Sequence, residues 1–174
     1  MASTYTPLGV EKMATGENAG TWGTKTNTNL EIIEQISGGY KVQTLNTAGA
    51  GANTTTLSKS DGATGATVAT RVIIMGAVSP EAITGNKILT MPVLTENFYL
   101  IKNSTSGAYT VQLKAATGSG ATVTWGTTDK DWKLIYFDGV ATNTGVYDLG
   151  LTTAANTQTL TNKTLTSPKI GTSI

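Results

Sequence analysis

Short runs of apolar and β-branched residues recur along residues 40–150, and the glycine, proline and asparagine residues between them constrain the fold most. Candidate strands lie at residues 40–45, 54–57, 71–78, 87–91, 97–103, 109–114, 121–125, 132–137 and around Val146 and Tyr147. Such residues fit pleated strands, whereas Gly and Pro mark strand ends. No long helical segments alternate with these runs, so a parallel α/β fold is disfavoured. The pattern predicts an antiparallel β-sandwich or barrel.

Two turns are also predicted within this region. Residues 97–103 and 109–114 flank the polar turn 104–107, and we expect them to form a β-hairpin. Asp138 and Gly139 mark a turn that precedes the last short strand. The run at residues 71–78 is continuously apolar, as expected of a buried strand.

Before the strands, residues 27–37 predict the one helix of the chain. Thr28 and Glu31 have the spacing of a capping box, and Gly38 with Gly39 predicts a left-handed stop. Three apolar residues fall on one helical face, with Ile32 beside them: Leu30, Ile33 and Ile36. We expect this face to be buried.

A glycine-rich loop leads into this helix and contains Trp22 between Gly20 and Gly23. Tryptophan is enriched at the centres of protein interfaces, so Trp22 can anchor the chain in a neighbouring subunit. The alternative is that Trp22 fills the base of its own domain. The sequence favours neither interpretation.

Composition excludes several classes of function. The net charge is +1 without a basic block, which argues against nucleic acid as a partner. Cysteine and histidine are both absent, which removes disulfides, thiolate chemistry and the usual transition-metal ligands. Charged residues make up only 13%, and the chain is rich in threonine and glycine, which suits a β-rich protein that stands in bulk solvent or packs into an assembly. We expect no membrane span and no signal peptide, and synthesis in a cytoplasm.

One acidic pair is a candidate for chemistry. Asp129 and Asp131 lie two residues apart between Trp125 and Trp132. The run lacks the glycine and the distal glutamate of a calcium loop, and it has no second acidic cluster for glycoside hydrolysis. We therefore interpret the pair as a solvated turn and expect no metal, no cofactor and no catalysis. The two tryptophans could stack on a sugar, but core packing or strand-end contacts are favoured.

Residues 151–174 contain no aromatic residue and little apolar mass. Such a segment cannot bury enough surface to fold alone. It contains an internal echo, in which Thr-Leu-Thr at residues 159–161 recurs at residues 164–166. We expect this segment to pair with copies of itself and to form a homotrimer through Leu160, Leu165 and Ile170.

The run from Gly16 through Glu34 to Tyr40, together with Leu-Thr-Asn-Lys-Thr-Leu-Thr-Ser-Pro at residues 160–168, resembles a known family. Both are similar to sequences of fibre-like virion proteins of tailed bacteriophages, above all aquatic ones. The resemblance covers the N-terminal quarter strongly and the last twenty residues moderately. Residues 98–103 and 136–139 resemble the middle of the family in style only.

The resemblance implies a virion structural protein that is not an enzyme. It divides the chain into an attachment arm, Trp loop and helix (1–39), an antiparallel β domain (40–150) and the extended start of a fibre shaft (151–174). The part that would bind the particle comprises Gly16, Glu17, Asn18, Trp22, Gly23, Asn27 and Asn29. The expected role is the proximal part of a tail fibre, bound to tail, neck or capsid proteins. The alternatives are a capsid decoration or head-fibre protein, and a carbohydrate-binding or depolymerase domain.

Overall fold

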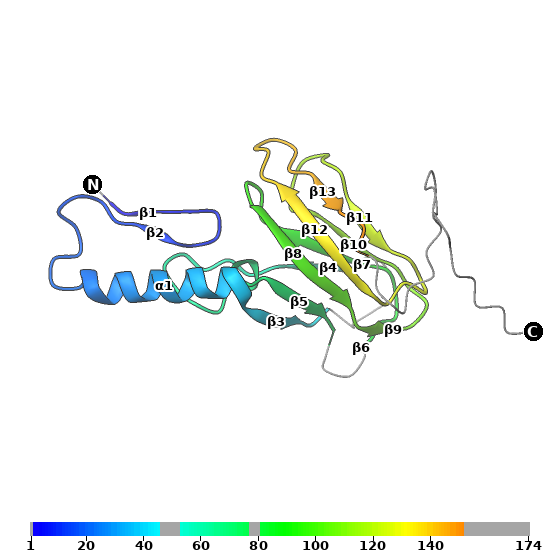
Figure 1. Cartoon of the computed structure of the whole chain (residues 1–174). Helices are drawn as coiled ribbons and strands as arrows, with labels where there is room; N and C mark the ends of the chain where they lie inside the picture. Colours follow the sequence, from blue (N-terminus) through cyan, green and yellow to red (C-terminus); the bar gives the residue numbers. More distant parts are fainter. Residues whose placement is uncertain (1, 46–52, 77–80, 152–174) are drawn as a thin grey trace, which may run out of the picture.

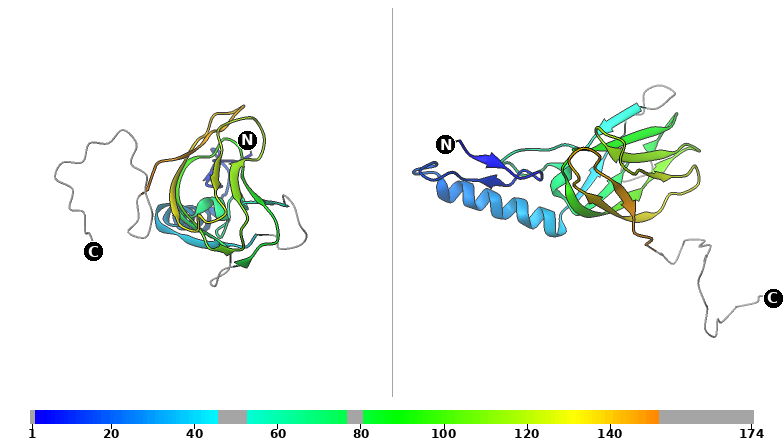
Figure 2. Two further views of the ribbon diagram at one scale, coloured as in Figure 1. Left: turned by 90° about the vertical axis from the view of Figure 1, so that its right-hand side faces the viewer. Right: turned by 90° about the horizontal axis from the view of Figure 1, so that it is seen from above.

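A computed structural model describes residues 2–45, 53–76 and 81–151 of the chain. Two β-sheets pack face to face, and a helix with a small hairpin beside it projects from one end of this sandwich (Figures 1 and 2). The hairpin pairs β1 (Thr4–Tyr5) with β2 (Glu11–Lys12), and the helix is α1 (Trp22–Gly38). The protein is therefore mainly β with one α-helix in its described part, as the sequence predicted.

The larger sheet has five strands in the order β13-β12-β8-β5-β3. Its strands are β3 (Tyr40–Gln43), β5 (Val72–Met75), β8 (Glu96–Asn103), β12 (Trp132–Asp138) and β13 (Val146–Asp148). β12 pairs antiparallel with both β8 and β13, whereas β5 pairs parallel with both β3 and β8. The predicted turn at Asp138 and Gly139 is confirmed, because it begins the connection between β12 and β13.

The second sheet has four strands in the order β11-β10-β7-β4. Its strands are β4 (Asn53–Thr56), β7 (Lys87–Met91), β10 (Val111–Ala115) and β11 (Val123–Trp125). β7 pairs parallel with β4 and β10, and β11 pairs antiparallel with β10. Two small elements complete the described part: the parallel pair of β6 (Glu81–Ala82) with β9 (Thr105–Ser106), and the 3-10 turn η1 (Thr67–Ala69).

The prediction of purely antiparallel sheets was wrong, and the barrel alternative was wrong as well, because the two sheets do not close. The predicted hairpin is the clearest case, since β8 and β10 belong to different sheets. Both strands alternate buried and partly exposed residues, and the buried residues of both belong to the common core. Alternation specifies which face of a strand is buried but not which strand lies beside it.

One hydrophobic core lies between the sheets. Trp125 is fully buried and donates from Nε1 to the carbonyl oxygen of Asp131 at 3.1 Å. Tyr99 packs edge-on against Phe137 with ring centroids 5.7 Å apart. The Tyr99 hydroxyl donates to the Val68 carbonyl at 2.9 Å, and burial raises the pKa of Tyr99 to about 12. The core interpretation of Trp125 is therefore confirmed.

Helix α1 starts five residues before its predicted beginning and exposes a different face. It begins at Trp22, so Thr28 lies inside the helix and the predicted capping box was wrong. Ile32 is 0% exposed and belongs to the common core, whereas Leu30 and Ile33 are 59% and 48% exposed. The predicted apolar face was therefore wrong for Leu30 and Ile33, whereas Ile36 packs against the core on the side of the helix that carries Ile32.

The end of the helix depends on a close approach and not on a left-handed residue. Gly39 is extended, with φ −64° and ψ 151°, and its N–H donates to the Gln35 carbonyl at 2.7 Å. The predicted left-handed stop was therefore wrong. A Cβ atom at Gly39 would lie 2.5 Å from the Gln35 oxygen, which explains why glycine is required there.

Candidate functional site

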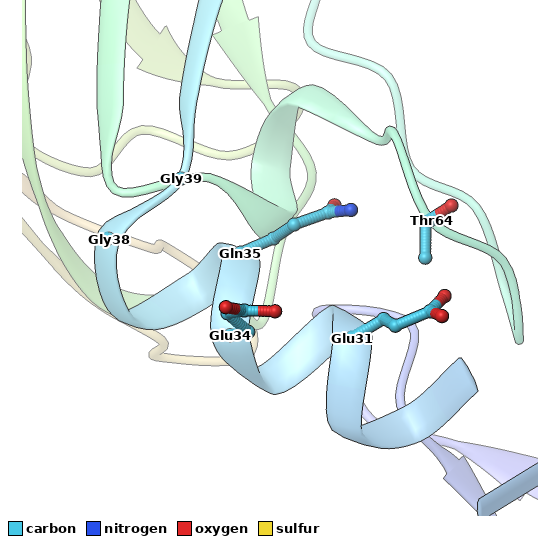
Figure 3. A pocket seen from close by; sticks show the side chains of 6 residues that line it. All are labelled: Glu31, Glu34, Gln35, Gly38, Gly39 and Thr64. Carbon is cyan, nitrogen blue, oxygen red and sulfur yellow. The ribbon is translucent and has the colours of Figure 1, made fainter. Parts of the chain in front are cut away.

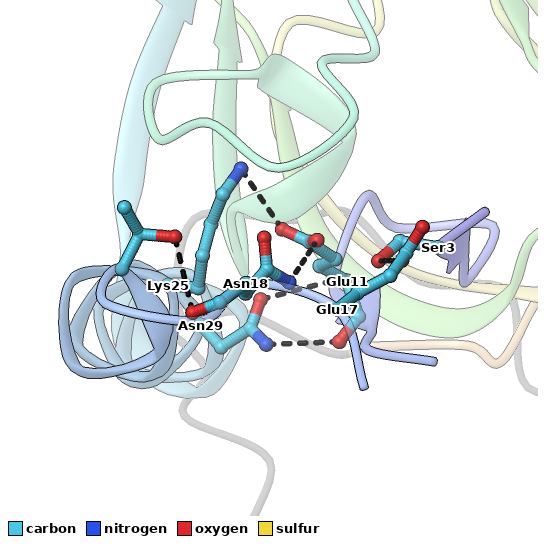
Figure 4. A network of polar contacts seen from close by, with 7 residues as sticks. Ser3, Glu11, Glu17, Asn18, Lys25 and Asn29 are labelled. Carbon is cyan, nitrogen blue, oxygen red and sulfur yellow. Dashed lines mark hydrogen bonds and ion pairs between the residues drawn. The ribbon is translucent and has the colours of Figure 1, made fainter. Parts of the chain in front are cut away.

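An amide side chain of helix α1 binds the backbone of the N-terminal hairpin. Asn29 accepts a hydrogen bond from the Glu11 backbone N–H and donates one to the Glu11 carbonyl, both at 2.9 Å (Figure 4). This pair of bonds resembles the pairing of two neighbouring β-strands. Asn29, which the resemblance assigned to partner binding, therefore supports the fold from within.

The Glu11 carboxylate is the centre of a polar network beneath the Trp22 loop. Glu11 is 6% exposed, and its Oε2 lies 3.1 Å from Nζ of Lys25. Asn18 donates to the other carboxylate oxygen at 3.3 Å (Figure 4). The hydrogen bond from Lys25 holds the pKa of Glu11 below its ordinary value, and the same contact raises the pKa of Lys25.

The loop between β2 and α1 is fastened at both of its sides. Ser3 Oγ donates to Glu17 at 2.6 Å, which connects the start of the chain to the loop. The Thr21 N–H donates to the Asn18 carbonyl at 2.8 Å and forms the turn that enters the helix. Asn18 and Gly16 adopt positive φ angles of 61° and 83°, which glycine and asparagine accept most readily.

This supported loop presents Trp22 to solvent. Trp22 is the first residue of α1 and is 64% exposed, at the end of the helix that lies far from the sandwich (Figure 1). The interpretation that Trp22 fills its own domain was therefore wrong. Leu30 and Ile33 continue the exposed apolar surface along the helix.

The structure separates the predicted binding residues into two groups. Glu17, Asn18 and Asn29 belong to the internal polar network. The other four lie outside this network. Trp22 and Asn27 are exposed on the helix, and Gly16 and Gly23 have open space where a Cβ would lie. The predicted trimerisation residues Leu160, Leu165 and Ile170 lie outside the described residues.

Sequence reasoning missed Glu11 and Lys25, the two charged residues of the network. They are separated by a loop, and no spacing rule relates charges that meet through tertiary folding. The exposure of Leu30 and Ile33 was missed as well. The polar residues Lys25 and Asn29 are visible in the sequence, but nothing in the sequence shows that they face the hairpin.

The acidic pair has structural contacts. Asp129 forms an ion pair with Lys133 at 3.0 Å, and an oxygen of Asp131 accepts the Trp132 N–H at 2.7 Å. Trp132 is half-buried, with Lys102 5.7 Å from its ring centroid. These contacts agree with the interpretation of this run as a turn and strand end. Within residues 2–45, 53–76 and 81–151, no three acidic side chains gather as a metal site.

A hollow of about 500 Å³ lies between the C-terminal half of α1 and the loop at Thr64 (Figure 3). Glu31 and Gln35 extend toward Thr64 across it. Gln35 accepts the Gly65 N–H at 3.0 Å, so the hollow lies where α1 meets this loop. In the described part of the chain, no helix has the length and apolarity that a membrane crossing needs.

Comparison with known proteins does not identify a protein family for this chain. The chain matches no protein-family model, and neither a curated protein nor a solved structure matches it.

Proposed function

We propose that this chain is a virion structural protein of a tailed bacteriophage, the proximal part of a tail fibre, which binds the particle through the Trp22 end of α1. In this proposal the β-sandwich connects that end to a host-binding shaft. The protein acts as a homotrimer in the virion, without a catalytic site, a cofactor or contact with nucleic acid or membrane. The similarity of residues 16–40 and 160–168 to phage fibre proteins supports this assignment.

The observation that carries the proposal is the exposure of Trp22 at the start of α1, directly after a loop that is fastened by its own hydrogen bonds. A tryptophan offers up to about 250 Å² of surface, so its exposed 64% leaves roughly 160 Å² for a partner. At about 25 cal/mol per Å², burial of that area contributes about 4 kcal/mol to binding. Because the loop is ordered beforehand, less conformational entropy is lost on association.

The test compares incorporation into particles with stability of the free protein. Trp22→Ala should lower the melting temperature only slightly and should strongly reduce incorporation into virions assembled without the wild-type protein. Tyr109→Ala, which removes an exposed aromatic side chain from the sandwich, is the matched control and should be incorporated normally. Normal incorporation of Trp22→Ala, or a loss that merely follows unfolding, would contradict the proposal.

Electron cryomicroscopy of the particles then distinguishes the tail-fibre assignment from the alternative of a capsid decoration or head-fibre protein. Density of the sandwich at the tail supports the proposed position. Density spread over the capsid shell would instead assign the protein to the capsid decoration or head-fibre class.

A further inference from the structure

An uncharged stripe runs along the exposed flank of α1. Thr26, Leu30, Ile33 and Ser37 follow one another at intervals of four, three and four residues. Leu30 and Ile33 are more exposed than any core position of the helix, while Ile32 between them is completely buried. The helix thus has two apolar surfaces, and residues 2–45, 53–76 and 81–151 cover only the one that carries Ile32.

This spacing is that of a coiled-coil seam, in which residues at alternating intervals of three and four meet a partner helix. In heptad terms Leu30 occupies an a position and Ile33 the following d position. Leucine at a with isoleucine at d favours assemblies of three or four helices over pairs. We propose that the α1 helices of three copies of this chain pack in parallel along the stripe of Thr26, Leu30, Ile33 and Ser37.

A second copy fits this surface because a seam of knobs and holes needs a partner with the same spacing, and a symmetric assembly supplies it from the same residues. The flanking charges permit the parallel arrangement. In register, Glu34 of one helix lies beside the Asn29 position of the next, and Trp22 beside Asn27. No carboxylate then faces another carboxylate across the seam.

The shape of the protein also leaves room for this assembly. The hairpin lies along one side of α1, and the first turns of the helix project beyond the sandwich (Figures 1 and 2). Three helices can therefore meet while their sandwiches lie around them. The inference rests on the self-association in the proposed function. It places the contact between copies on helix α1 instead of the C-terminal segment.

Sedimentation equilibrium of the full chain tests the seam. The wild-type protein should have three times the chain mass of 18.0 kDa. The double variant Leu30→Gln with Ile33→Gln should be monomeric and retain the circular dichroism of the wild type. The matched control, Val140→Gln with Leu149→Gln, removes two exposed apolar side chains from the sandwich and should remain trimeric.

Single cysteines report the orientation of the helices, because the chain has none of its own. Thr26→Cys and Ser37→Cys should each form disulfide-linked pairs of chains when oxidised separately. Cross-linking that appears only when the two variants are mixed would show antiparallel helices and overturn the proposal.

A monomeric or dimeric wild-type protein would also overturn it. If the Leu30→Gln, Ile33→Gln variant stays trimeric, the α1 helices do not form the trimer interface. The homotrimer of the proposed function would then form through another surface. If the variant is monomeric yet particles still incorporate it, the seam is right and the particle contact does not depend on it.

Discussion

Ile32 is the fully buried side chain that α1 contributes to the core, so Ile32→Ala should destabilise the whole protein. Ile32 is 0% exposed and packs in the cluster that also contains the core residues of both sheets. Alanine keeps the helix, since its helix propensity exceeds that of isoleucine. The substitution therefore isolates the packing of one side chain from the formation of the helix.

The magnitude follows from the atoms removed. Three buried carbon atoms at about 0.8 kcal/mol each give roughly 2.4 kcal/mol, and the cavity that remains raises the loss to about 3–5 kcal/mol. For a chain of this size, that loss corresponds to a fall in melting temperature of roughly 6–20 °C. Leu149→Ala removes the same number of carbon atoms at a site that is 55% exposed, and should cost about 1 kcal/mol or less.

Calorimetry of both variants at one protein concentration measures these shifts, because association would make the melting temperature depend on concentration. Hydrogen exchange shows where the loss occurs. If Ile32→Ala leaves the sandwich melting unchanged and only the helix amides exchange faster, α1 is a separate unit. Equal effects of Ile32→Ala and Leu149→Ala would refute the reasoning from burial.

Three further predictions concern the N-terminal unit. Asn29→Ala removes both hydrogen bonds to the Glu11 backbone and should cost about 1–3 kcal/mol, seen as faster exchange of the Glu11 amide. Because the folded pKa of Glu11 lies below its ordinary value of 4.5, its stabilising contribution is complete above pH 4.5 and is lost as the pH falls through the lower folded value. A pH titration followed by NMR should show the hairpin loosening in that range, and Glu11→Gln should abolish this dependence. Gly39→Ala should lower the free energy of unfolding by about 1–3 kcal/mol in denaturant, because the new Cβ would lie 2.5 Å from the Gln35 carbonyl oxygen. At Gly23 the position of a Cβ is open space, so Gly23→Ala should stabilise α1 by up to about 1 kcal/mol. Equal responses of the two glycines would contradict the close-contact argument.

The positions of most strands could be predicted because each is a local pattern. The predicted strands at residues 87–91 and 132–137 correspond closely to β7 and β12. Their partners could not be predicted. β5 pairs with β3 and β8 in parallel, which joins segments far apart in the chain. The continuous apolar run of Val72 to Met75 indicates a buried strand but does not identify its neighbours.

The helix shows a different limit. Thr28 and Glu31 have the right spacing for a cap, but the helix extends back to Trp22. Residues 22–27 have low helix propensity, and a short isolated helix of this kind is marginal. The contacts of Lys25 and Asn29 with Glu11 hold this part of the helix against the hairpin. Tertiary contacts therefore decided the boundary, and the face that α1 buries follows from the same contacts.

The polar network gives the N-terminal motif a physical interpretation. Glu17 and Asn18 are loop residues that bind the chain's own Ser3 and Glu11, and Trp22 follows directly after the turn they stabilise. If the particle recognises Trp22, these residues act on binding through the position of the tryptophan and not by touching the partner. An exposed tryptophan on an unfastened glycine-rich loop would lose entropy on binding, which opposes the gain from its burial. In the proposed function, the network would thus connect the conformation of the loop to the affinity of Trp22 for the particle.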